Sequence, residues 1–288
     1  IDAAYYLIHS MSSSTSDFDE KEERAVKNFN TYLEPTNCKQ VIYVGGIANE
    51  QSLSKHLWSR KNVENILYQG SAAVTVLRAA IIVGSGSASF EIIRDLCEKL
   101  PLMVTPRWVK TKCQPIAIRD VLNYLTGVLG NEECYNESFD IGGPDVLSYR
   151  EMMEGYARFR KLNLTIITLP FLSPKISSYW LYFVTSTSYK LALNLVDSMR
   201  IEVITSDTRL KDILKIESIS YQKAIELAFK KIKQNQVVSS WKDSMISGRF
   251  RSDLNRYVEV PVHGCVKDKQ SILLKNPEKA LENIWSIG

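Results

Sequence analysis

The chain has 288 residues, of which 45% are hydrophobic and 24% charged, and its formal net charge is +4. This composition is typical of a globular protein with a substantial core, and so small a charge gives no reason to expect nucleic acid as a partner. The five cysteines are widely spaced and odd in number. That pattern indicates reduced thiols in a cytoplasmic protein and excludes a disulfide framework or a cysteine-based metal site.

Strands and helices are predicted to alternate over the first third of the chain. The expected strands are apolar runs at 3–9, 40–44 and 73–83. The first expected helix begins after Asp17 as its N-cap and ends at 35–37, and two more cover 54–68 and 90–100. Because this order requires right-handed crossovers, it predicts a doubly wound α/β fold, with a parallel sheet between two layers of helices.

Shorter elements are predicted after this region. The expected strands lie at 116–118, 139–141, 165–169 and 201–205. The expected helices lie at 121–129, 176–198 and 220–233, and a further helix is expected to begin at 148–151. Asp120 is predicted to cap the helix at 121–129, and Ser148 with Glu151 forms a capping box. These elements predict a small mixed subdomain on the substrate side.

A change of pattern near residue 240 predicts a domain boundary. The polar run at 233–236 interrupts the helical pattern, and 257–262 alternates between polar and apolar residues. We therefore expect one domain over 1–239 and the beginning of a second over 240–288. Prolines and lysines interrupt the apolar stretch at 164–196, so it lacks the run of about 20 residues that a membrane helix needs. A core helix or pocket wall is expected there, and membrane contact is not.

The buried run that begins at Leu77 ends abruptly in Gly84-Ser85-Gly86, and a helical pattern with Phe90 follows. Ligands of open α/β sheets lie at the carboxyl ends of such strands, so a small molecule is predicted beside this corner. A single Gly-x-Gly after a strand suits a tight turn as well as an anion cradle, and both interpretations remain open.

Several short motifs together resemble one protein family. They are Tyr5–Met11, Ile42–Gly46, Leu53–Arg60, Leu77–Ala79, Gln114–Val121 and Asp140–Pro144. The family is the atypical, extended short-chain dehydrogenases/reductases, in the NmrA-like NAD(P)H-binding group close to sugar-nucleotide epimerases. The resemblance covers about 1–232 and implies a Rossmann-like domain. It aligns the first strand with the fourth strand of the dinucleotide fold, which implies that the glycine-rich phosphate loop lies ahead of Ile1 in a longer protein.

The resemblance also implies where the cofactor and substrate bind. Cofactor contacts are expected at His9, Ser10, Met11, Gly45, Gly46, Arg78, Ala79 and Ile82. Substrate contacts are expected at Gly84, Ser85, Gly86, Ser89, Phe90, Arg107 and Trp108.

The catalytic pair implied by the resemblance differs from the family pattern. Classical members use Tyr-x-x-x-Lys, and the corresponding register here is His56 with Arg60. Neutral histidine can carry a proton near pH 7, and Arg60 can bind ribose or phosphate oxygens. A helix-surface pair without chemistry and an inert cofactor clamp are the alternatives. Gly45 and Gly46 stand where the family carries its catalytic serine.

The leading functional prediction is an NAD(P)-dependent oxidoreductase that transfers hydride between nicotinamide and a small organic substrate. NADP is the expected cofactor and His56 the expected proton carrier. The alternative is a non-catalytic NAD(P)-binding sensor. A third possibility is a lipid- or quinone-handling protein that uses the apolar region at 164–196 as its pocket.

Overall fold

The computed structural model describes residues 1–8, 18–47, 55–169, 198–233, 258–259 and 267–268. The chain divides into two compact units, Ile1–Lys242 and Asp243–Gly288. In the second unit the described residues form one antiparallel pair, β11 (Val258–Glu259) with β12 (Lys267–Asp268).

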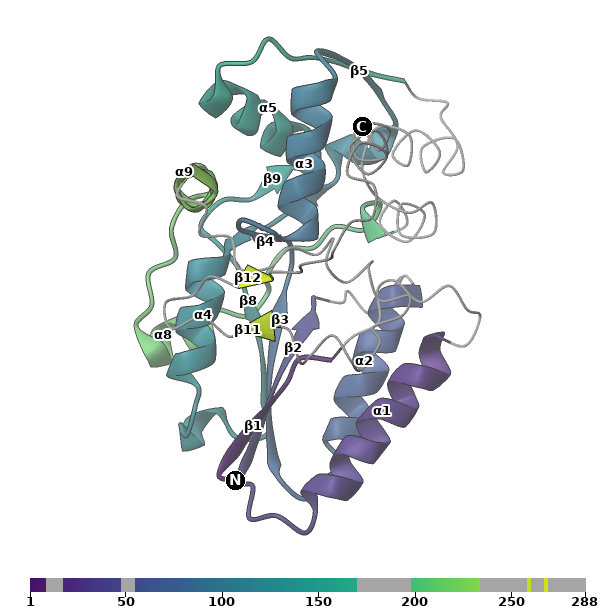
Figure 1. The fold of residues 1–288 in the computed structure, drawn as a ribbon, viewed down its shortest axis with the longest axis vertical. Helices are drawn as coiled ribbons and strands as arrows, with labels where there is room; N and C mark the ends of the chain where they lie inside the picture. The colour runs from purple at the N-terminus through teal and green to yellow at the C-terminus, as the bar shows by residue number, and fades with distance from the viewer. Residues whose placement is uncertain (9–17, 48–54, 170–197, 234–257, 260–266, 269–288) are drawn as a thin grey trace, which may run out of the picture. The chain divides into compact units, whose positions relative to one another are not determined.

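A four-stranded sheet forms the centre of the first unit (Figure 1). Its strands, in spatial order, are β1 (Ala3–Tyr6), β2 (Gln40–Gly46), β3 (Ala73–Ala79) and β8 (Glu137–Ile141). All three pairings are parallel. The predicted α/β fold class with a parallel sheet is therefore confirmed.

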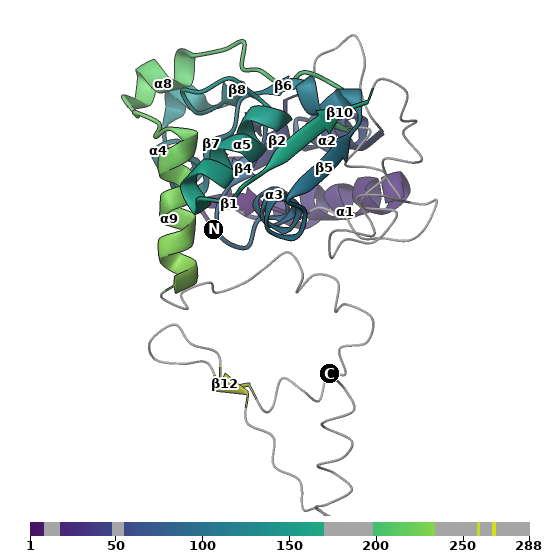
Figure 2. The same ribbon diagram turned by 90° about the horizontal axis from the view of Figure 1, so that it is seen from above.

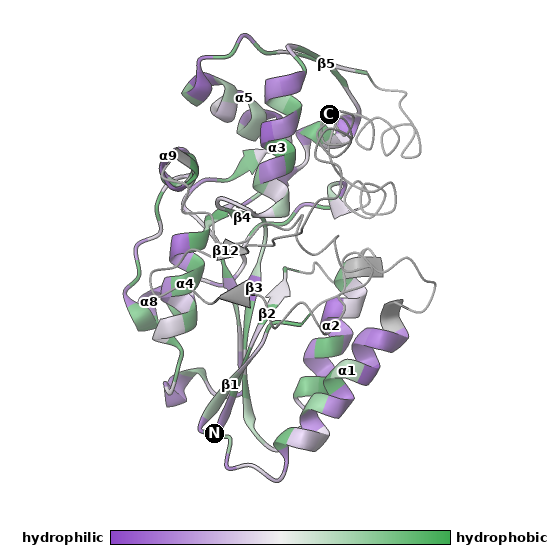
Figure 3. Ribbon diagram, viewed as in Figure 1, coloured by the Kyte–Doolittle hydropathy of each residue, from purple (hydrophilic) through white to green (hydrophobic). Residues whose placement is uncertain are grey.

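Helices cover both faces of the sheet, because the strand side chains alternate between two apolar clusters. On one face α1 (Phe18–Leu33) and α2 (Lys55–Leu67) pack against Tyr43, Val74 and Val76. On the other face α4 (Ile118–Gly127) and α8 (Arg209–Leu214) pack against Leu77 and Phe139. Figure 3 shows hydrophilic and hydrophobic residues interspersed along α1 and α2, as expected for helices with one buried face.

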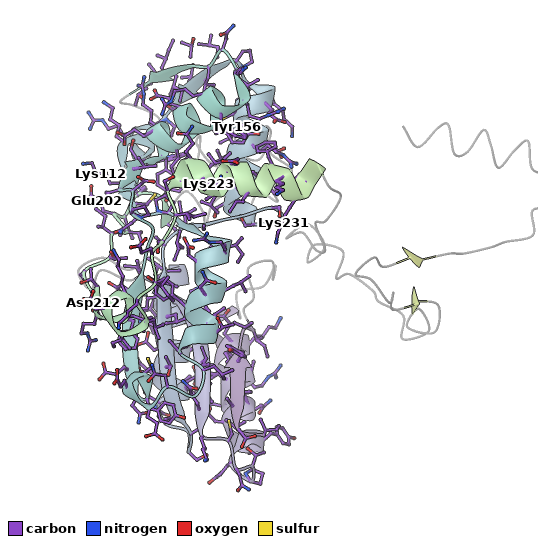
Figure 4. All side chains as sticks on the ribbon, turned by 90° about the vertical axis from the view of Figure 1, so that its left-hand side faces the viewer. Lys112, Tyr156, Glu202, Asp212, Lys223 and Lys231 are labelled. Atoms are coloured by element: carbon purple, nitrogen blue, oxygen red, sulfur yellow. The ribbon has the colours of Figure 1, made fainter. Side chains whose placement is uncertain are left out.

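Beyond the carboxyl ends of the central strands lies a second group of helices and short strands, which we call the second layer. Three helices share one apolar core there: α3 (Ala88–Lys99), α5 (Tyr149–Arg160) and α9 (Tyr221–Lys233). Figure 4 shows α9 with Lys223 and Lys231 on it, and Tyr221 on this helix donates a hydrogen bond to the Met152 carbonyl of α5. Short strands complete the layer: β4 (Ile82–Val83) with β7 (Ile116–Ala117), β5 (Leu102–Thr105) with β10 (Thr165–Thr168), and β6 (Lys112–Cys113) with β9 (Leu147–Ser148). The pairings are mixed, since β6 and β9 are antiparallel whereas the other two pairs are parallel.

The structure corrects three sequence predictions. The strand expected at 73–83 is two strands, because the chain leaves the central sheet after Ala79 and β4 pairs with β7 instead. Asp120 does not cap α4: the cap residue is Ala117, and the buried Asp120 carboxylate accepts a hydrogen bond from the Ile219 backbone. The strand expected at 201–205 is only an isolated bridge between Val203 and Cys113. The helix expected at 176–198 lies almost wholly outside the described residues.

None of the helices in the described part of the chain is long and apolar enough to cross a membrane.

One predicted helix start is confirmed in detail. Ser148 caps α5, its hydroxyl accepts a hydrogen bond from the Glu151 backbone at 3.2 Å, and the Glu151 carboxylate accepts one from the Ser148 backbone at 2.7 Å.

Replacing Ser148 with alanine is expected to lower the free energy of unfolding by about 1 kcal/mol, because the first turn of α5 loses its cap. Hydrogen bonds from the Ser148 backbone and hydroxyl hold the pKa of Glu151 below its ordinary value. This contribution to stability is therefore present at neutral pH and is lost as the pH falls through the lowered pKa. Urea unfolding of both proteins over an acidic pH series measures it; identical pH profiles would contradict the prediction.

Candidate functional site

The carboxyl ends of three adjacent strands meet at one edge of the central sheet. In register, Gly46 of β2 lies beside Ala79 of β3, which lies beside Ile141 of β8. The Ala79 carbonyl also accepts a hydrogen bond from Ile47, just beyond β2. This edge is where open parallel sheets bind their ligands, and the predicted cofactor residues Gly45, Gly46 and Ala79 are together there.

Arg60 joins helix α2 to this edge. Its Nη1 donates a hydrogen bond to the Val44 carbonyl at 3.3 Å, and its own backbone carbonyl accepts one from the Tyr43 hydroxyl at 3.3 Å. A Cβ on Gly46 would lie 2.9 Å from Leu57 Cδ2, so glycine allows α2 to approach the end of β2 closely. The guanidinium is thereby held beside the carboxyl end of β2.

Tyr43 remains a hydrogen-bond donor at this position. Burial raises its pKa to about 12, although the positive charge of Arg60 acts in the opposite direction. The phenol is therefore protonated at neutral pH, as its bond to the Arg60 carbonyl requires.

His56 lies in α2, one turn before Arg60, so the predicted spacing of the pair is retained along the helix. Its side chain is outside what the structure describes, and so are all of His9, Ser10 and Met11. The roles predicted for these four residues stay predictions.

Arg78 is held by an acid that the sequence analysis did not identify. Its Nε and Nη2 donate to the two carboxylate oxygens of Glu64 at 3.1 and 2.6 Å. Glu64 is 3% exposed, and it also binds Lys61. This pairing fixes Arg78 to helix α2 beside the edge of the sheet.

Gly84, Ser85 and Gly86 form a tight turn. The Ser87 backbone donates a hydrogen bond to the Gly84 carbonyl at 3.2 Å, and Gly86 has φ of +84°. Both features define a β-turn with a left-handed third residue, which glycine adopts without strain. Of the two interpretations left open by the sequence, the structure therefore shows a turn.

The turn leads directly into helix α3. Ser87 caps the helix by accepting a hydrogen bond from the Phe90 backbone, and its hydroxyl donates to the carbonyl of Ile82 at 3.1 Å. Ser89 lies in the first turn of α3 and is partly exposed. Phe90 is packed in the core, with its ring 6.2 Å from that of Tyr156, and it does not line the corner.

Arg107 and Trp108 lie in a short 3-10 helix, η1 (Arg107–Lys110), after β5. Arg107 is exposed. Trp108 is buried with its ring edge-on to Tyr149, and no atom of the described residues accepts a hydrogen bond from its Nε1. These two residues belong to the second layer, and no interaction with Arg60 or Gly46 is among those described.

Asp140 is a second charged residue of the edge that sequence reasoning did not single out. It lies beside Arg78 in the β3–β8 register, and its carboxylate accepts hydrogen bonds from the backbone and hydroxyl of Ser206, both at 3.0 Å. The only available signal was its place inside the Asp140–Pro144 motif. Among the described residues, no group of three or more His, Cys, Asp or Glu side chains could hold a metal ion.

No protein-family model matches this sequence, and neither does any curated protein. The fold, in contrast, resembles solved enzymes. UDP-glucuronic acid 4-epimerase from Bacillus cereus, in complex with NAD, is 13% identical, with a TM-score of 0.60 over 81% of this chain and 75% of that one. RMD from Pseudomonas aeruginosa, complexed with NADPH, is 13% identical, with a TM-score of 0.58 over 81% of this chain and 82% of that one.

A nucleoside-diphosphate-sugar epimerase from Staphylococcus aureus is 11% identical, with a TM-score of 0.61 over 78% of this chain and 76% of that one. At such identities the likeness establishes the Rossmann-like fold and nothing about chemistry.

Proposed function

We propose that this chain is part of an NAD(P)-dependent oxidoreductase of the extended short-chain dehydrogenase/reductase kind, in its NmrA-like group. The observation that carries the proposal is Arg60, held at the carboxyl end of a parallel strand by the Val44 carbonyl. It occupies the position where the sequence resemblance places a cofactor-binding side chain. The fold shared with enzymes that bind NAD or NADPH supports the same proposal.

The residues at this edge fit the ribose and nicotinamide end of such a cofactor. Arg60 would bind ribose or phosphate oxygens, and His56 would carry the proton between substrate and solvent. When bound, the nicotinamide supplies or accepts the hydride. Ala79 and the Gly84–Ser87 turn would border the substrate, a small organic molecule, and NADP is the form to test first.

Gly46 and Gly84 do not fit the pyrophosphate. A Cβ on Gly46 would meet Leu57 at 2.9 Å, and a Cβ on Gly84 would meet Ile118 at 2.5 Å. Both positions are therefore filled by the protein's own side chains, whereas a phosphate loop presents open backbone N–H groups. We propose that other parts of the protein bind the pyrophosphate.

The rival function is a non-catalytic NAD(P)-binding sensor. It is favoured by Gly45 and Gly46, which present no hydroxyl at the end of β2, and by histidine and arginine in place of tyrosine and lysine at 56 and 60. A sensor needs the binding edge but not the proton carrier.

The two functions are distinguished by one assay on the full-length protein. NADPH absorbance is followed against a panel of carbonyl compounds and quinones, for the wild type, His56→Ala and the neighbouring control Lys55→Ala. The oxidoreductase predicts a loss of kcat/KM of about 100-fold or more for His56→Ala only, as expected for a general acid. Turnover unaffected by His56→Ala would remove His56 from the mechanism. Tight NADPH binding without turnover of any substrate would establish the sensor instead.

A further inference from the structure

The two-stranded ribbon β5–β10 exposes an apolar face. Figure 2 shows β5 and β10 side by side. In their parallel register Leu102 lies beside Thr165 and Val104 beside Ile167, and Leu169 follows directly after β10. The exposed fractions are 56% for Leu102, 39% for Val104, 46% for Ile167 and 42% for Leu169. We call these four side chains the β5–β10 face.

The opposite side of the ribbon is ordinary core. Met103 and Ile166 belong to the apolar cluster shared by α3, α5 and α9, and Thr105 is fully buried. The alternation along both strands therefore puts apolar side chains on both sides, although only one side packs on the protein. The ribbon is parallel, and parallel strands are normally covered on both faces, so an apolar face left exposed calls for something to cover it. A contiguous exposed apolar patch marks a contact surface.

Basic residues flank this face at both ends. Lys99 and Lys161 precede the two strands, and Arg107 and Lys110 follow β5. Arg107, Lys110 and Lys161 are exposed, and none of them forms an ion pair with another described residue.

The acids of the neighbouring helices, in contrast, are already paired. Glu98 binds Arg160 at 3.1 Å, and Asp95 binds Lys99 at 3.3 Å. The rim of the β5–β10 face therefore has a surplus of positive charge.

We propose that the β5–β10 face binds the surface of an anionic lipid membrane, with its aliphatic side chains among the acyl chains and the three basic residues on the headgroups. We choose this partner on charge: the exposed basic residues at the ends of the ribbon would attract the negatively charged headgroups of anionic lipids. The proposal does not depend on the oxidoreductase function, and the contact is peripheral.

Co-sedimentation of the 288-residue chain with lipid vesicles tests the proposal. One set of vesicles contains only phosphatidylcholine, and the other contains equal parts of phosphatidylcholine and phosphatidylserine. Binding is expected to the second set, and Arg107→Ala with Lys110→Ala should weaken it about 30-fold, since each cation near the surface contributes roughly a fivefold factor.

Val104→Glu with Ile167→Glu should abolish binding, whereas the control Leu122→Glu, at an exposed side chain of helix α4, should not change it. Circular dichroism and gel filtration of each variant establish that it is folded and report its oligomeric state. The proposal would be overturned if neither the double alanine variant nor the double glutamate variant changed vesicle binding, or if the wild type bound neither kind of vesicle. A change in oligomeric state caused by the glutamates, without vesicle binding by the wild type, would assign the face to a second copy of the chain.

Discussion

Replacing Gly143 with alanine is expected to lower the free energy of unfolding by about 2–4 kcal/mol. A Cβ at this position would lie 2.3 Å from the Pro115 carbonyl oxygen, far inside van der Waals contact. The same oxygen accepts a hydrogen bond from the Gly143 backbone at 3.0 Å. Overpacking typically costs 1–3 kcal/mol and a lost hydrogen bond about 1 kcal/mol. If the segments of Gly143 and Pro115 move apart to relieve the clash, the hydrogen bond between them is lost as well, so both costs apply.

The neighbouring contacts leave little room for such a shift. Gln114 donates from Nε2 to the Gly143 carbonyl at 2.6 Å and from its backbone to the Val203 carbonyl at 2.9 Å. On the other side of Pro115, the Ile116 backbone donates to the Ile81 carbonyl at 2.8 Å, so the segment is held on both sides. Urea unfolding at neutral pH, with the slope checked for two-state behaviour, measures the loss.

Gly155→Ala is the matched control, because it adds the same methyl group inside helix α5. There the nearest atom to the new Cβ is Tyr221 Cε1, at 3.4 Å, which is ordinary contact. Alanine in a helix interior is more favourable than glycine by about 0.5–1 kcal/mol, so this variant should be slightly more stable than the wild type. Equal destabilisation by both substitutions would show that the contact with Pro115 is not the cause.

The architecture of the sheet could be predicted because its signals are local. Each strand of the first hundred residues is an apolar run, and each helix repeats its apolar residues with helical spacing. Val74 and Val76 face one helical layer while Leu77 faces the other, as the clusters show. Alternation within a strand and crossover handedness then determine the fold with no knowledge of distant contacts.

The sequence predictions that the structure corrects concern residues whose partners lie far away in the chain. Aspartate is a common helix cap, but Asp120 lies inside α4, and its carboxylate accepts a hydrogen bond from the backbone of Ile219, far along the chain. The apolar run after Ala79 is continuous in sequence, yet Ile82 pairs with Ile116 of another strand. Neither partner is visible within a short window of sequence.

The sequence predicted where a candidate site would lie, but it did not predict the ion pairs beside it. The carboxyl edge follows from strand order, whereas Arg60 was singled out only by the family resemblance, and its role stays a prediction. Glu64 was missed because its partner Arg78 is on a different element, and a glutamate within a polar stretch of helix is otherwise typical of a solvated face. Only the packing of α2 on β3 reveals that this glutamate is buried.

That buried pair supports the second large prediction. Arg78→Met is expected to destabilise the protein by about 2–3 kcal/mol, because the Glu64 carboxylate, with a side chain only 5% exposed, loses its two-pronged partner. Removing one member of a buried ion pair typically costs 3–5 kcal/mol. The expected loss is smaller here, since Lys61 stays 2.8 Å from the same carboxylate and Arg78 is itself 24% exposed. Urea unfolding measures the change.

Two further variants separate the lost ion pair from the lost arginine stem. Lys61→Met removes the more exposed partner, whose side chain is 36% exposed, and should cost less than about 1 kcal/mol, as surface pairs do. Combining Arg78→Met with Glu64→Leu removes both charges and should restore most of the stability, because an apolar pair can replace a buried ionic one. If the double variant is as unstable as Arg78→Met alone, the packing of the arginine stem against β2 and α2 is responsible, and the uncompensated carboxylate is not.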